Sequence, residues 1–214
     1  MDISLNGHNA FLVKTASGSV ICDPADEAEA TFVPSSAADD TVITAILQSK
    51  PRASSFRNQV GGKDTISHPG EYEIGDLGLR GIALPANPES ESKKTITSFR
   101  IDAEGLSVYM LGLAKSSPDA RTAQRIGSVD VLLLDVARLH MDVKELSSII
   151  GALDPSYVFV NGLVAGSSEP GEKLKSLLGE TGSDQMNNEP QLRVSVTRSS
   201  LPADRQLVVL RPRA

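Results

Sequence analysis

The sequence predicts a layered α/β (α+β) fold, in which β-sheets are stacked and covered by helices. The first half consists of short β-rich runs separated by turns, the middle alternates strands and helices, and the end returns to strands. Because sheets and helices each bury an apolar face against another element, this order favours packed layers. The 214 residues contain no internal repeat and no convincing linker, so we predict one domain over residues 1–214.

The first elements are predicted to be strands, because their residues are β-branched or aliphatic and turn pairs such as Asn6-Gly7 and Ser17-Gly18 separate them. The predicted strands are residues 3–5, 11–14, 18–22 and 41–47. The last of these, TVITAIL, is apolar almost throughout, which is typical of a strand buried on both faces. The polar segments 24–40 and 48–62 are predicted to be loops.

A group of hairpins follows. Pro69-Gly70 is a turn signal, and Gly75-Asp76 separates two β-rich runs as a hairpin turn does. Two further runs pair naturally across residues 102–105, and the polar segment 85–94 forms a tip. The predicted hairpin strands are residues 72–74, 77–81, 95–101 and 106–111.

Three helices are predicted from their start signals. The first begins at Ser117-Pro118-Asp119 and ends at Gly127. The second opens with the capping-box-like pair Asp142 and Glu145 and has an apolar face at helical spacing. The third opens at residues 168–170. The remaining predicted strands are residues 129–136, 157–160, 192–196 and 206–210.

Composition excludes several classes of function. The net charge of -6 argues against a nucleic-acid-binding surface and against binding to anionic membranes. The lone Cys22 cannot form an internal disulfide, and its apolar neighbours predict a buried thiol. The N-terminal residues do not resemble a signal peptide, and no run approaches the roughly 20 apolar residues of a membrane span. We therefore expect a cytoplasmic protein.

Five segments, in this order, resemble one family. They are LNGHNAFLV (5–13), VICDP (20–24), HPGEYEIGDLGLRGI (68–82), IGSVDVLLLDV (126–136) and RVSVTRSSLPADRQLVVL (193–210). They are similar to the small bacterial branch of the metallo-β-lactamase superfamily that is related to ascorbate-6-phosphate lactonase. The Pro-Gly-Glu-Tyr-Glu-Ile segment is the most specific element. The resemblance implies an αββα sandwich with a metal site at one edge of the two sheets.

In that family, His and Asp residues hold one or two metal ions, which generate hydroxide near neutral pH. The family's His-x-His-x-Asp-His motif corresponds here to Gln-Ser-Lys-Pro-Arg-Ala after the strand TVITAIL. The resemblance places these residues at ligand positions: Gln48, Lys50, Arg52 and Ala53 in that motif, Leu113 for the bridging carboxylate, and Asn161-Gly162 for the final histidine. The chain therefore looks like a degenerate member that lacks most metal ligands, and no metal or other cofactor is expected.

A rebuilt site is the alternative. Its candidate catalytic residues are His8, Asp23, His68 and Glu71. Asp23 alone keeps a residue of the family's motifs, and one carboxylate does not hold a divalent ion unaided. His8 and His68 lie beside turns in family-like segments, and the simpler interpretation is that they bind no metal. Zinc is expected only if these residues have formed a new site.

Lys50 and Arg52 replace two metal ligands with cations, which leaves three interpretations. The segment is a solvated basic loop, or its cations form an internal ion pair with Asp23, or they line a pocket for an anion. An arginine fork suits phosphate or carboxylate, and Arg57 is close in sequence.

Three functions follow from these patterns. The favoured one is a catalytically inactive pseudo-hydrolase that binds an anionic small molecule or a protein partner. The second is a divergent hydrolase with a rebuilt metal-dependent or metal-free site. The third is a structural subunit that forms a homo-oligomer or pairs with an active paralogue. Fold resemblance alone does not decide between them, so enzymatic activity is left open.

Overall fold

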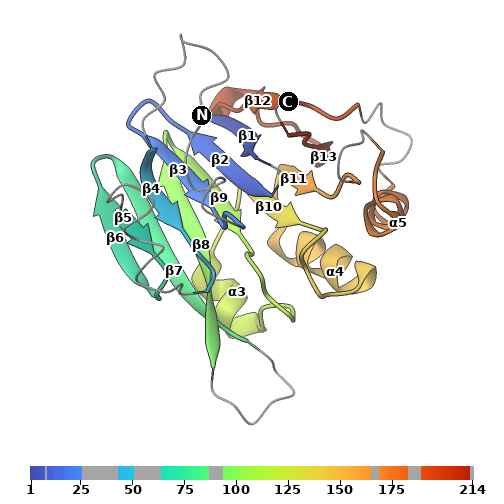
Figure 1. The fold of residues 1–214 in the computed structure, drawn as a ribbon, viewed down its shortest axis with the longest axis horizontal. Coiled ribbons are helices and arrows are strands. Elements are labelled where there is room, and N and C mark those ends of the chain that lie inside the picture. The colour runs from blue at the N-terminus through green and yellow to red at the C-terminus, as the bar shows by residue number, and fades with distance from the viewer. Residues whose placement is uncertain are drawn as a thin grey trace.

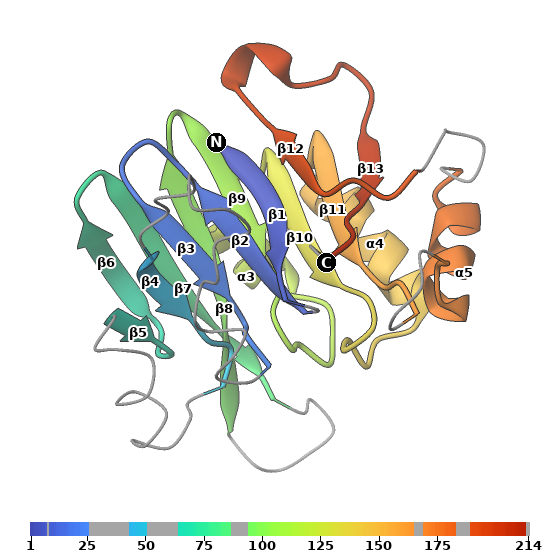
Figure 2. The same cartoon turned by 45° about the horizontal axis from the view of Figure 1, so that its top comes forward.

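The computed structural model describes residues 1–7, 9–25, 43–50, 64–86, 94–164, 169–182 and 189–212. His8 and Arg52, two of the predicted site residues, lie outside this part of the chain. The described strands form two mixed sheets that face each other, with helices against the second sheet (Figures 1 and 2). This arrangement confirms the predicted layered α/β fold.

The first sheet has the strand order β12-β1-β2-β3-β4-β5. Its members are β1 (Asp2–Asn6), β2 (Ala10–Lys14), β3 (Ser19–Cys22), β4 (Ile43–Leu47), β5 (Asp64–Ile66) and β12 (Arg193–Ser195). β1, β2 and β3 are antiparallel, whereas β3, β4 and β5 run parallel. The sequence did not predict β5, because three residues are too short a run to show a strand pattern.

The second sheet has the strand order β13-β11-β10-β9-β8-β7-β6. Its members are β6 (Gly70–Ile74), β7 (Leu77–Pro85), β8 (Thr95–Ala103), β9 (Leu106–Met110), β10 (Val131–Asp135), β11 (Tyr157–Asn161) and β13 (Gln206–Val209). β6 to β9 form an antiparallel meander, whereas β9, β10, β11 and β13 are parallel. The predicted hairpin around Gly75-Asp76 is confirmed.

The described helices are α3 (Ala120–Ile126), α4 (Val143–Leu153), α5 (Glu172–Glu180) and the short 3-10 helix η1 (Arg198–Ser200). The predicted capping box of α4 is present, with Asp142 and Glu145 each bonding the other's backbone amide. The N-cap of α3 is Asp119 rather than Ser117, because the Asp119 carboxylate accepts from the Thr122 amide. α5 begins at Glu172, two residues beyond the predicted start.

Two large apolar clusters hold the layers together. One lies between the sheets and includes Leu5, Leu47, Phe99 and Phe159. The other lies between the second sheet and the helices, which cover its outer face (Figure 2). Aromatic residues are 4% of the chain, so this interior is built mainly from aliphatic side chains. No described helix has the length and hydropathy of a membrane span.

Candidate functional site

The carboxyl ends of five strands meet at one edge of the two sheets. β3 and β4 are parallel neighbours in the first sheet, and β9, β10 and β11 are parallel neighbours in the second. A backbone hydrogen bond joins the two sheets near this edge, since the Thr97 amide of β8 donates to the Ser49 carbonyl at 2.9 Å. We call the residues at these ends the strand-end site: Asp23, Gln48, Ser49, Lys50, Leu113, Asp135, Arg138 and Asn161.

Asp23 is buried and holds the segment that follows β4. Its Oδ1 accepts from the Ser49 amide at 2.6 Å, and its Oδ2 accepts from the Ser49 hydroxyl. The Asp23 backbone has a left-handed φ of 50°, and its amide donates to the Leu47 carbonyl at 2.8 Å. The one retained motif carboxylate therefore fastens the end of β3 to the loop after β4.

Gly112 brings the end of β9 against this pair. Its φ is 69°, and a Cβ there would lie 1.8 Å from Ser49 Oγ and 3.1 Å from Asp23 Oδ2. Only glycine fits a left-handed backbone this close to another side chain. The next amide, that of Leu113, donates to Ser49 Oγ at 3.3 Å. Ser49 thus links the ends of both sheets.

Asp135, at the end of β10, forms an ion pair with Arg138 through the Nε of that guanidinium. Asn161 Nδ2 donates to the other Asp135 oxygen at 3.4 Å. Burial raises the pKa of Asp135, the positive charge and hydrogen bonds of Arg138 oppose this, and the negative charge of Asp23 adds to the rise. A buried carboxylate with a raised pKa depends on its cationic partner to remain charged at neutral pH.

The residues at the implied metal-ligand positions do not fit a metal. Gln48 is 3% exposed and Asn161 is 4% exposed, and both are amides. Leu113 has no donor atom in its side chain, and Lys50 is an exposed cation. The described residues contain no group of three or more His, Cys, Asp or Glu side chains that could hold a metal ion. Zinc sites need imidazole, thiolate or carboxylate ligands, so this donor set is unsuitable.

Gln48 is a destabilising feature of the site. Its Nε2 is the one buried side-chain nitrogen or oxygen among the described residues that lacks a hydrogen-bond partner. A buried donor without a partner costs about 1–3 kcal/mol.

We expect Gln48→Met, which keeps the length of the side chain without the amide, to raise the free energy of unfolding by about 1 kcal/mol or more. The measurement is the midpoint of urea unfolding. Gln124→Met, at an exposed position of α3, is the matched control and should change stability by less than about 0.5 kcal/mol. A loss of stability in Gln48→Met alone would contradict the prediction.

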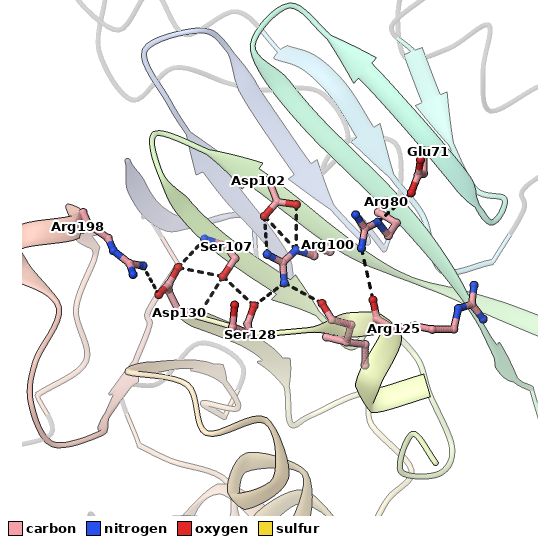
Figure 3. Close-up of polar contacts among 10 residues, drawn as sticks. Glu71, Arg80, Arg100, Asp102, Ser107, Arg125, Ser128, Asp130 and Arg198 are labelled. Carbon is pink, nitrogen blue, oxygen red and sulfur yellow. Dashed lines mark hydrogen bonds and ion pairs between the residues drawn. The ribbon is translucent and has the colours of Figure 1, made fainter. Parts of the chain in front are cut away.

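Some of the predicted site residues lie in or near the strand-end site, and others do not. Lys50 and Asp23 lie in the strand-end site, but Lys50 makes no ion pair within the described part of the chain. His68 follows β5 at the same edge and is exposed, with its Nδ1 3.3 Å from Ser67 Oγ. Glu71 points out from β6 and pairs with Arg80 at 3.3 Å, away from the site (Figure 3).

The opposite edge of the second sheet holds a separate polar cluster (Figure 3). Arg100 bonds both oxygens of Asp102 and the Ile126 carbonyl at the end of α3. Asp130 accepts from Ser107 and from Arg198 at 2.6 Å. These groups satisfy one another, so we assign the cluster to packing of α3 and of the segment before β13.

Sequence reasoning missed the two residues that organise the strand-end site. Ser49 occupies the variable position between two ligand positions, so its motif gave no reason to single it out. Arg138 lies three residues after Asp135 in the loop that follows β10. An acidic residue at a strand end with an arginine three positions later is a signal that could have suggested an internal ion pair.

The comparisons with known proteins agree with this fold. The family model of the beta-lactamase superfamily domain matches residues 2–160. A putative zinc-dependent hydrolase of the metallo-beta-lactamase superfamily from Thermotoga maritima has a similar structure, with a TM-score of 0.71 and 17% identity over 98% of this chain and 97% of that one. No protein of curated function matches the chain.

Two other solved structures share the fold. A metallo hydrolase from the archaeon Ignicoccus hospitalis has a TM-score of 0.57 and 16% identity, over 92% of this chain and 99% of that one. An isothiocyanate hydrolase from Delia radicum gut bacteria has a TM-score of 0.63 and 11% identity, over 92% of this chain and 100% of that one. Identities this low support the fold alone.

Proposed function

The chain belongs to the beta-lactamase superfamily, and we propose that within it the protein is a pseudo-hydrolase that binds an anionic ligand at the strand-end site without hydrolysing it. In this proposal the fold has been kept and metal-dependent chemistry has been lost. The ligand is an anionic small molecule, bound near Lys50 and Arg52. Neither residue has a role in metal binding.

The proposal rests on the hydrogen-bond partners of the two carboxylates of the site. Asp23 holds the amide and hydroxyl of Ser49, and Asp135 holds the guanidinium of Arg138. A carboxylate that binds a metal must direct an oxygen to the ion. Here the oxygens of Asp23 and of Asp135 are directed to protein donors instead. An arginine beside Asp135 also places a fixed positive charge where a metal would meet repulsion.

The anionic character of the ligand is supported by the cations in and after the segment that replaces the family's metal-binding motif. Lys50 is exposed and makes no ion pair with any described residue. Arg52 and Arg57 follow it in the sequence, and residues 48–63 contain no Asp or Glu. Arginine and lysine without acidic neighbours favour binding of carboxylate or phosphate groups.

Elemental analysis of the purified, untagged protein tests the loss of the metal. After supplementation with zinc, manganese and iron, we expect well below one metal ion per chain, and no turnover of a lactone or phosphodiester above the rate with chelator. The positive control is a variant with six ligands restored: Gln48→His, Lys50→His, Arg52→Asp, Ala53→His, Leu113→Asp and Asn161→His. If this variant binds metal and the wild type does not, the loss of metal binding is due to these six substitutions.

A different result would overturn the proposal. One or two metal ions per wild-type chain, with turnover that a chelator abolishes, would mean that a hydrolytic site has been rebuilt. His8→Ala and His68→Ala would then identify its ligands, since a variant that stays folded but loses metal has lost one.

A further inference from the structure

β6 is the longest of the edge strands in the described part of the two sheets. The other edge strands are β12 and β5 in the first sheet and β13 in the second. β12 and β5 have three residues each, and Gln191 bonds the backbone of Val209 and Arg211 beside β13. β6 has five residues in unbroken register with β7 and lies at the outer margin of the second sheet (Figure 2). It has no proline, lysine or bulge of the kind that protects edge strands from pairing.

The open backbone groups of this edge belong to Glu71 and Glu73. β6 and β7 are joined by a two-residue turn, so the flanking pair Ile74 and Leu77 exchanges hydrogen bonds, and every second pair along the ladder does the same. The amides and carbonyls of Glu71 and Glu73 therefore point away from β7. No residue that the structure describes bonds them there. An extended segment can pair with such an edge as one more strand.

The two faces of β6 have opposite character. Tyr72 and Ile74 are partly buried and pack against the apolar cluster between the sheets. Glu71 and Glu73 are exposed on the other face, and the side chain of Glu71 is 81% exposed. A residue added beside Tyr72 would extend the apolar cluster, whereas the residues on either side of it would lie beside the two glutamates. Because side chains alternate along a strand, the edge favours a segment with an apolar residue between two charged ones.

The charge of this face is predominantly negative. A hollow of about 380 Å³ adjoins β6 on the side of the glutamates. Its lining includes four carboxylates and one guanidinium, those of Glu71, Glu73, Asp76, Asp102 and Arg80. Gly78 lies opposite Glu73 on one side and Asp102 on the other, and it has no side chain to fill the space between them.

The cations nearby leave part of this negative charge unbalanced. Arg80 pairs with Glu71 at 3.3 Å, and Arg100 pairs with Asp102 at 2.8 Å, as Figure 3 shows. Glu73 forms no ion pair with any residue in the described ranges. The hollow beside Glu73 therefore suits the side chain of a lysine or arginine.

We propose that the β6 edge binds an extended segment of another protein, in which an apolar residue stands between two lysines or arginines. The segment pairs antiparallel with β6 through the backbone of Glu71 and Glu73. Its apolar residue lies against Tyr72, and its cations lie beside the glutamates, where opposite charges on neighbouring strands stabilise pairing. This surface is separate from the strand-end site, so the inference does not depend on the proposed function.

A second copy of the chain is disfavoured as the occupant by the same charges. Antiparallel pairing of two β6 strands about Tyr72 would place Glu71 of each copy opposite Glu73 of the other. Like charges directly opposite each other destabilise a strand pair. The charge of the edge therefore discriminates against self-association and in favour of a basic partner.

The test uses the full 15N-labelled chain and the peptide Thr-Lys-Val-Lys-Val-Lys-Thr, acetylated and amidated at its ends. Amide hydrogen exchange is followed by NMR with and without saturating peptide. We expect the amides of Glu71 and Glu73 to exchange at least about tenfold more slowly with the peptide, because both donors gain acceptors. The amides of Tyr72 and Ile74, which already donate to β7, should change less.

Two controls separate strand pairing from attraction between charges. The same peptide with its lysine amides N-methylated keeps its charge but cannot donate to the edge, and it should bind about tenfold more weakly. Glu73→Lys should bind the unmodified peptide about fivefold more weakly, because an attraction becomes a repulsion. Glu180→Lys makes the same change of charge at an exposed position of α5 and should bind as the wild type does.

Other results overturn the inference. If the methylated peptide binds as tightly as the unmodified one, or if exchange at Glu71 and Glu73 is not slowed, the peptide does not add to this edge. If Glu73→Lys and Glu180→Lys weaken binding equally, only the net charge of the protein matters. If the two amides are protected without peptide, and more so at higher protein concentration, a second copy occupies the edge instead.

Discussion

Gly112→Ala is expected to lower the free energy of unfolding by about 2–5 kcal/mol. An alanine with a left-handed φ costs about 1–2 kcal/mol, and overpacking adds about 1–3 kcal/mol. The new Cβ would lie 1.8 Å from Ser49 Oγ, so the Asp23–Ser49 hydrogen bonds would also be displaced. For a chain of this size the melting temperature should fall by about 10 °C.

Gly105 provides a matched control for that experiment. Its φ of 71° is nearly that of Gly112, but nothing lies within 4 Å of a Cβ built on it. Gly105→Ala therefore carries the backbone cost alone and should be destabilised by about 1–2 kcal/mol. Ser49→Gly combined with Gly112→Ala should recover part of the loss. Equal effects of the two alanine variants would show that the close approach to Ser49 is unimportant.

Arg138→Met is expected to cost about 3–5 kcal/mol at neutral pH, because it leaves the buried Asp135 carboxylate without its cation. The folded-state pKa of Asp135 is raised by burial. Ionising it in the folded protein therefore costs stability that is absent below the pKa of the unfolded chain and grows as pH rises through the raised value. Loss of Arg138 raises that pKa further, so the deficit should be smallest in acid.

Urea unfolding of wild type and variant over a pH series measures this dependence. Arg125→Met is a suitable control, since the Arg125 side chain is exposed on α3 and should matter little. Adding Asp135→Asn to Arg138→Met should restore stability at neutral pH and remove the pH dependence of the deficit. A deficit that is the same at every pH would show that Arg138 stabilises the fold through its carbonyl contacts and not through Asp135.

The sequence predicts much of the fold because the elements carry local signals. The capping box at Asp142 and Glu145 and the hairpin at Gly75 depend on neighbouring residues, and both are confirmed. The sequence alone does not distinguish Ser117 from Asp119 as the N-cap of α3, because both are good capping residues. The approximate length of a helix and the alternation of a strand can therefore be predicted from the sequence. The exact first residue of a helix depends on which of two possible capping residues forms the hydrogen bond.

The strand-end site is less predictable, because its contacts join residues that are distant in sequence. The resemblance locates Gln48 and Asn161 as lost ligand positions, but it does not say which cation meets which carboxylate. The sequence offered Lys50 and Arg52 as partners for Asp23. In the described part of the chain Asp23 bonds Ser49 and Arg138 pairs with Asp135, and Arg52 lies outside that part. Such choices are made by tertiary packing, which places the loop after β10 beside the end of β3.

The positions of β12 and β13 have a consequence for the order in which the nascent chain can fold. β12 pairs with β1, so that Asp2 lies opposite Ser195, and β13 pairs with β11. One strand of each sheet is therefore synthesised after all the other strands of that sheet. Until then the edges of β1 and β11 are unpaired, and exposed strand edges are templates for aggregation. Pairing across such sequence separation is slow, so the chain is exposed to aggregation until β12 and β13 have been made and paired.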